Sequence, residues 1–68
     1  MIMRSVVSTD ILRVGYESGT LHIQFKNGAL YSYHNVPEHL YVNLISASSV
    51  GSFFHQHIKG RYGDVKIG

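Results

Sequence analysis

The feature that most constrains this chain is an Asn-Gly pair between two alternating segments. Leu21–Lys26 and Ala29–His34 alternate apolar and polar residues, and Asn27-Gly28 separates them. An Asn-Gly pair in this setting is a strong short-range signal for a β-hairpin. The stretch from Thr20 to Pro37 therefore predicts a hairpin to which the preceding segment adds a strand and across which the following segment lies.

The preceding segment, Ile11–Glu17, also alternates, as expected of a half-buried strand. Ser18-Gly19 follows it and is typical of a two-residue turn. Because this turn fixes the register, the alternating apolar residues of the first strand (Leu12, Val14 and Tyr16) fall on the same side as those of the second. The expected pairs are Glu17 with Thr20, Tyr16 with Leu21, Val14 with Ile23, and Leu12 with Phe25.

The second hairpin admits two registers. A two-residue loop at Asn27-Gly28 turns Leu30 inward and both Tyr31 and Tyr33 outward, whereas a three-residue loop over 26–28 does the reverse. Burying two tyrosine rings removes more apolar area from water than burying one leucine. We therefore expect the second register, with Ile23 opposite Tyr31 and Leu21 opposite Tyr33.

Two helices are expected after the hairpin. Asn35 precedes Pro37 and Glu38 in the manner of a capping residue, and the first helix then carries an apolar stripe. That stripe is Leu40, Tyr41, Leu44 and Ile45. Ser48 or Ser49 is expected to cap the second helix, and Gly60 is placed to end it.

The second helix carries its own apolar stripe: Val50, Phe53, Phe54 and Ile58. Gly51, in its first turn, weakens the helix and is expected to mark a close approach to another backbone. A three-stranded sheet has limited area to cover two adjacent phenylalanines. Phe53 and Phe54 are therefore either both packed inside, or one is exposed as a contact site.

These elements predict one α+β domain, a three-stranded antiparallel meander with two C-terminal helices packed on one face. At 68 residues there is no room for a second domain. The core is expected over about 8–62, and 63–68 is a tail that either frays or adds an edge strand. No secretory signal or membrane-spanning run is evident and cysteine is absent, so we expect a cytoplasmic protein.

The charge of the chain allows nucleic-acid binding without demanding it. The chain contains six Lys and Arg residues and four Asp and Glu residues, and only 15% of its residues are charged. The basic residues are spread along the sequence rather than clustered, which implies a weak field.

The best candidate surface is the sheet face opposite the helices, with basic groups near it. The nucleic-acid-binding candidates are Arg13, His22, Gln24, Lys26, His34, Lys59 and Arg61. An antiparallel sheet normally has one solvated polar face, which explains the same residues without a ligand. Tyr31 and Tyr33 could stack on bases, but the expected register makes them core rings.

Neither a metal site nor an active site is expected. His55 and His57 lie two apart on a helix and so point in different directions, and His22 and His34 lack a third ligand. There is no cysteine nucleophile, and Glu38 is already assigned as a helix cap. We expect no cofactor, no metal and no catalysis.

Several short segments occur in an order that resembles the KTSC domain. They are VGY at 14–16, LHIQF at 21–25, NG at 27–28, YSY at 31–33, NVP at 35–37 and ASSVGSFFHQHIKGRY at 47–62. The KTSC domain is named for its occurrence at the C-terminus of some lysyl-tRNA synthetases and also occurs as a free-standing small protein. The resemblance implies a role in RNA binding, through that association, and carries over no catalytic or ligand-binding residue.

Two functions are therefore expected of this chain. One is a non-enzymatic module that binds RNA or other single-stranded nucleic acid weakly. The other is a protein–protein interaction module, either a homodimer or a small bacterial or phage accessory protein that docks on a larger partner. Salt dependence separates them, because phosphate contacts weaken steeply with salt.

Overall fold

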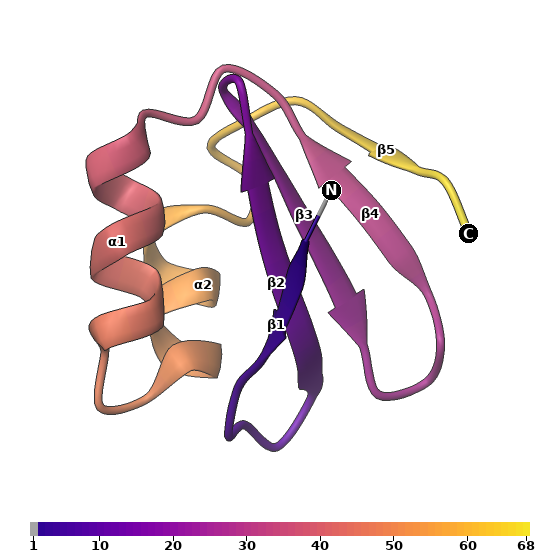
Figure 1. The fold of residues 1–68 in the computed structure, drawn as a ribbon, viewed down its shortest axis with the longest axis vertical. Coiled ribbons are helices and arrows are strands. Elements are labelled where there is room, and N and C mark those ends of the chain that lie inside the picture. Colours follow the sequence, from indigo (N-terminus) through magenta and orange to yellow (C-terminus); the bar gives the residue numbers. More distant parts are fainter. Residues whose placement is uncertain (1) are drawn as a thin grey trace.

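A five-stranded antiparallel sheet with two helices on one side makes up the computed structural model, which describes residues 2–68 (Figure 1). The strands lie in chain order across the sheet: β1 (Met3–Ser5), β2 (Ile11–Glu17), β3 (Thr20–Phe25), β4 (Leu30–Tyr33) and β5 (Asp64–Lys66). Helices α1 (Glu38–Ser46) and α2 (Val50–His57) follow β4, and the chain then returns to add β5 beside β4. The predicted α+β class and the helical layer are confirmed.

The prediction of three strands was wrong, because the sheet has five; of the two alternatives for the tail over 63–68, the edge strand is the one that forms. β1 pairs with β2 at one edge, and β5 pairs with β4 at the other. Each added strand is only three residues long and shows no alternation of its own. Such a segment becomes a strand because the neighbouring strand offers unpaired backbone groups, which the local sequence does not reveal.

The hairpin between β2 and β3 follows the expected register over most of its length. Val14 pairs with Ile23, and the pairing continues to the turn at Ser18-Gly19. The expected pair of Leu12 with Phe25 was wrong, because a β-bulge shifts the register and places Ile11 opposite Phe25. Ile11 is consequently fully buried, whereas Leu12 is 37% exposed.

The hairpin between β3 and β4 has the register that buries the tyrosines. Ile23 pairs with Tyr31, Leu21 pairs with Tyr33, and Gly28 has a positive φ of 94° in the loop. Tyr33 is 4% exposed and belongs to the core. The choice between the two registers on grounds of buried ring area is confirmed.

The start of α1 differs from the expectation. The helix begins at Glu38, its N-cap is Pro37, and no side chain caps it. Asn35 instead adopts a positive φ of 61°, so it turns the chain rather than capping the helix. At α2 the serine cap is confirmed, because the Ser49 side chain accepts a hydrogen bond from the Ser52 amide.

The core lies between the sheet and the helices. It consists of Ile11, Val14, Leu21, Ile23, Tyr33, Val36, Leu44, Val50, Phe54 and Ile58. Of the two adjacent phenylalanines, Phe54 is fully buried and Phe53 is half-buried against the His57 ring, with centroids 4.5 Å apart. The Tyr16 hydroxyl donates a hydrogen bond to the Val36 carbonyl oxygen and so ties β2 to the segment before α1.

Candidate functional site

An aromatic cleft of about 320 Å³ opens between the helix side of the sheet and the end of α2. Four rings line it: Phe25, Tyr31, Tyr33 and Phe54. The remaining lining residues are Asn27, Ala29, His55, Lys59 and Asp64. Because β3, β4, β5 and the end of α2 all contribute, no single segment of the sequence encodes the cleft.

The rings of the aromatic cleft hold one another in place. Tyr31 meets Phe25 edge to face, with centroids 5.7 Å apart, and Tyr33 meets Phe54 in the same way at 5.4 Å. Tyr31 and Tyr33 lie on the same face of β4, with centroids 6.5 Å apart. Edge-to-face pairs stabilise both partners beyond simple burial, so the walls of the cleft are preorganised.

Tyr33 places a neutral hydroxyl in the aromatic cleft. Burial raises the pKa of Tyr33 to about 12, with smaller contributions from the negative charge of Asp64 and from Tyr31. The Tyr33 side chain therefore remains a hydrogen-bond donor at every physiological pH. Neither Tyr31 nor Tyr33 hydrogen-bonds through its hydroxyl to another residue of the described chain, which leaves both groups for water or a ligand.

One lysine lines the aromatic cleft, and a second lines the hollow next to it. Lys59 lines it directly and also lines an adjoining hollow of about 390 Å³ whose walls include Lys26 and Phe25. Both lysine side chains are exposed. The tertiary structure thus brings two candidates that are far apart in the sequence to neighbouring hollows that share Phe25.

The seven residues predicted to bind nucleic acid do not form one surface. Arg13, His22, Gln24 and His34 belong to the sheet face turned away from the helices, whereas Lys26 and Lys59 line hollows on the helix side. Arg61 follows α2 and donates a hydrogen bond from Nε to the Gln56 carbonyl oxygen at 2.9 Å. The sequence did not place Phe25, Phe54 and Asp64 in one site, because these residues become neighbours only when α2 and β5 pack.

The open face of the sheet carries no phenylalanine or tyrosine among its described strand residues. The alternation puts those rings on the helix side. His22 Nδ1 lies 3.0 Å from the Ser32 hydroxyl. Burial lowers the pKa of His22, while the negative charge of Glu17 acts in the opposite direction and the neighbouring His34 lowers it further. This face therefore lacks stacking rings, which favours the aromatic cleft as the candidate site.

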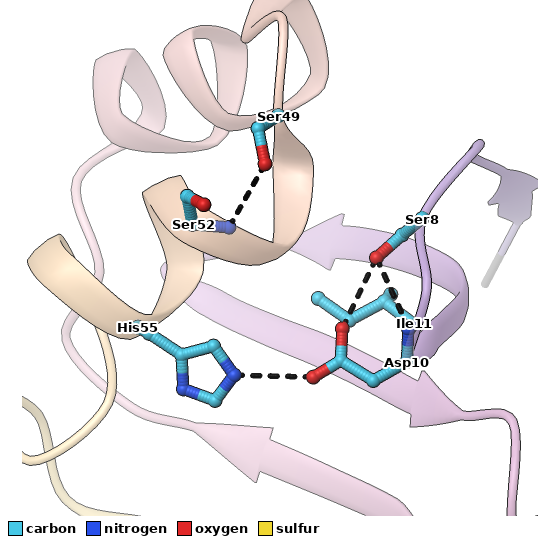
Figure 2. Close-up of polar contacts among 6 residues, drawn as sticks. All are labelled: Ser8, Asp10, Ile11, Ser49, Ser52 and His55. Atoms are coloured by element: carbon cyan, nitrogen blue, oxygen red, sulfur yellow. Dashed lines mark hydrogen bonds and ion pairs between the residues drawn. The ribbon is translucent and has the colours of Figure 1, made fainter.

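A polar cluster of Ser8, Asp10 and His55 joins the β1–β2 loop to α2 (Figure 2). The Ser8 hydroxyl donates to Asp10 Oδ1 at 3.1 Å, and His55 Nε2 lies 3.1 Å from Asp10 Oδ2. A catalytic triad requires the histidine to lie between the serine and the acid. Here the carboxylate lies between the serine and the histidine, so the histidine does not act on the serine hydroxyl and the cluster is a structural link.

The glycine beside this cluster has a packing role that differs from the expected one. A Cβ atom at Gly51 would lie 3.0 Å from Asp10 Oδ1 and 3.2 Å from the Ser8 hydroxyl. The close approach is therefore to side chains of the β1–β2 loop and not to another backbone.

A hollow of about 550 Å³, larger than the aromatic cleft, lies between β1 and the loop that joins α1 to α2. Its lining is mostly small or aliphatic, with Arg4 as the one charged side chain. It holds neither rings nor a second cation, so it offers less chemistry than the aromatic cleft. Within residues 2–68 no three His, Asp or Glu side chains gather as a metal site.

Comparison with known proteins agrees with this fold. The family model of the KTSC domain matches residues 7–62. The chain belongs to the KTSC domain family. In the solved structure of a KTSC domain protein from Yersinia pestis, the fold matches with a TM-score of 0.91 at 41% identity, over 98% of this chain and 97% of that one.

Two further relatives match most of this chain. A protein from Tsukamurella paurometabola is 33% identical over 67 residues, covering 96% of this chain and all of the relative. An uncharacterized protein from Stutzerimonas stutzeri is 35% identical over 57 residues, covering 81% of this chain and 80% of that protein. The described part of this KTSC domain has no helix of the length and apolar character needed to cross a bilayer.

Proposed function

We propose that this KTSC domain binds single-stranded RNA through the aromatic cleft. One base stacks on Tyr31 inside the cleft, and the flanking phosphates contact Lys59 and Lys26. The single observation that carries the proposal is the placement of both lysines beside a preorganised aromatic wall.

The chemistry of the aromatic cleft fits a flat, partly polar ring. Its volume of about 320 Å³ is near the lower end of the range of roughly 300–1,000 Å³ typical of small-ligand sites. Base–aromatic stacking contributes about 1–3 kcal/mol per base. The neutral Tyr33 hydroxyl and the Asn27 amide supply hydrogen-bonding groups to the edge of a base.

The charges at the cleft predict weak, salt-dependent binding. Two lysine–phosphate contacts on a single strand give a slope of about −1.4 in log affinity against log salt. A fourfold rise in monovalent salt is therefore expected to weaken binding about sevenfold. A slope near zero would contradict phosphate contact.

The test is fluorescence anisotropy of a labelled single-stranded RNA oligomer titrated with the protein. Lys59→Ala and Lys26→Ala are each expected to weaken binding and to make the salt slope shallower. Tyr31→Leu keeps apolar volume but removes the stacking ring, so it is expected to weaken binding about fivefold or more.

Arg13→Ala is the matched control. It removes the same charge as the lysine variants, but from the open face of the sheet. If Arg13→Ala weakens RNA binding as much as Lys59→Ala, the open face and not the aromatic cleft is the binding surface. If none of the variants changes a measurable affinity, the proposal is wrong.

A further inference from the structure

The outer edge of β5 carries a pattern that matches a second copy of itself. β5 lies at the end of the sheet beyond β4, so one side of its backbone has no strand partner within the described chain (Figure 1). Its residues are Asp64, Val65 and Lys66, an acid and a base on either side of an aliphatic residue. We propose that two copies of this protein associate by antiparallel pairing of their β5 strands about a two-fold axis at Val65.

The backbone of β5 has its free groups at the positions that such a pairing needs. The His34 amide donates to the Gly63 carbonyl oxygen at 2.9 Å, and the Ile67 amide donates to the Leu30 carbonyl oxygen at 2.8 Å. In an antiparallel strand, the backbone groups of alternate residues bond to the same neighbouring strand. The backbone N–H and C=O groups of Val65 therefore point toward β4, and those of Asp64 and Lys66 point outward.

A two-fold axis at Val65 aligns opposite charges in that same register. Asp64 of one copy then lies opposite the partner's Lys66, and the two exchange backbone hydrogen bonds in both symmetry-related positions. Opposite charges directly across an antiparallel pair stabilise it, whereas like charges destabilise it. The directions of the free backbone groups and the order of the charges are separate observations, and both favour the register with the two-fold axis at Val65.

The other edge of the sheet does not offer this match. Arg4 is the one charged residue of β1 and lies at its centre. A two-fold pairing centred on β1 would set two arginines against each other. An edge lysine often blocks strand pairing, but on β5 the lysine is balanced by an aspartate two residues earlier.

The apolar residues near β5 gain cover in the same arrangement. Val65 and Ile67 lie on the open side of the sheet and are each 52% exposed. Pairing about Val65 brings the two Val65 side chains together, since directly opposite residues are closest at a non-hydrogen-bonded position. The paired segment is short, so the dimer is expected to be weak and to exchange quickly.

The pairing would also change the aromatic cleft. Asp64 lines the cleft and is the one carboxylate that does so. In the dimer the partner's Lys66 lies opposite Asp64 and offsets its negative charge at the rim. An effect of this charge offset on ligand binding rests on the proposed RNA binding, whereas the dimer itself does not.

A charge-swap series measured by sedimentation velocity, from micromolar to millimolar protein, tests the dimer. Asp64→Lys and Lys66→Asp are each expected to weaken self-association about tenfold, because both symmetry-related pairs become repulsive. The double variant Asp64→Lys, Lys66→Asp restores the complementary pattern and is expected to dimerise like the original protein. Arg13→Asp, the same reversal of a positive charge but on β2 and away from the β5 edge, is expected to leave self-association unchanged.

Three outcomes would overturn the dimer: a monomer at every concentration, a dimer indifferent to both single swaps, or a double variant that stays monomeric while its circular dichroism shows the native fold. RNA binding is measured separately on the same proteins. A charge-dependent dimer that binds no RNA would refute the proposed function and leave the dimer standing. RNA binding by a protein that stays monomeric at every concentration would refute the dimer and leave the proposed function standing.

Discussion

His55 and Asp10 join parts of the chain that are far apart in sequence, since His55 Nε2 lies 3.1 Å from Asp10 Oδ2. The contact links α2 to the loop between β1 and β2, beside the hollow that carries Lys59. The hydrogen bond from His55, assisted by one from Ser8, holds the pKa of Asp10 below its usual value of 3.8.

The hydrogen bond between His55 and Asp10 makes the free energy of unfolding depend on pH in the acid range. Because the folded-state pKa of Asp10 is depressed, its contribution is present above pH 3.8 and is lost as the pH falls through the lowered value. Both side chains are nearly half exposed, so we expect Asp10→Asn to cost at most about 1 kcal/mol at neutral pH. Urea unfolding at neutral pH and in acid measures this. The difference between the two proteins should shrink in acid. Glu17→Gln, which removes an exposed acid that has no ion pair within residues 2–68, should not reproduce it.

Gly51 should resist replacement by alanine although it lies in a helix. Replacing glycine by alanine inside a helix normally stabilises the helix by about 1 kcal/mol. Here the new Cβ would crowd Asp10 Oδ1 at 3.0 Å and the Ser8 hydroxyl at 3.2 Å, so we expect Gly51→Ala to destabilise the protein. In a Ser8→Ala, Asp10→Ala background the same change should stabilise it by up to about 1 kcal/mol. Thermal unfolding of the four proteins closes the cycle, and a stabilising Gly51→Ala in the original chain would refute the clash.

The bulge in β2 predicts opposite sensitivities at two adjacent residues. Ile11 is fully buried, so Ile11→Ala should cost about 2–5 kcal/mol. Leu12 is 37% exposed, so Leu12→Ala should cost less than about 1 kcal/mol. Chemical denaturation of both variants decides between the bulge and the simple alternation, which would make Leu12 the costly position.

The burial of Tyr33 leads us to expect that the folded protein loses stability in strong alkali. Burial raises the pKa of Tyr33 to about 12, above its ordinary value of 10.0. A raised folded-state pKa contributes stability that is fully present below pH 10.0 and is lost as the pH rises toward about 12. Tyrosinate absorbance should show one tyrosine titrating late. Tyr33→Phe should remove that late step, and its persistence would assign the step to a different tyrosine.

The sequence by itself determined the two hairpins, the inward placement of the tyrosines and the positions of both helices. These follow from local rules: Ser18-Gly19 and Asn27-Gly28 fix turns, alternation fixes faces, and ring area decides between registers. The Ser49 cap is likewise a local interaction and was predicted among two candidates. The family was also evident from the order of short segments, and the match over residues 7–62 shows it.

Only the tertiary structure decided the bulge, the edge strands and the composition of the aromatic cleft. The bulge buries Ile11 in place of Leu12 because packing in the core selects which of the two adjacent aliphatic residues is buried. β5 forms because β4 offers an unpaired edge when the chain returns from α2. That return sets Asp64 beside Tyr33 and Lys59, three residues whose proximity depends on long-range packing and leaves no trace in local pattern.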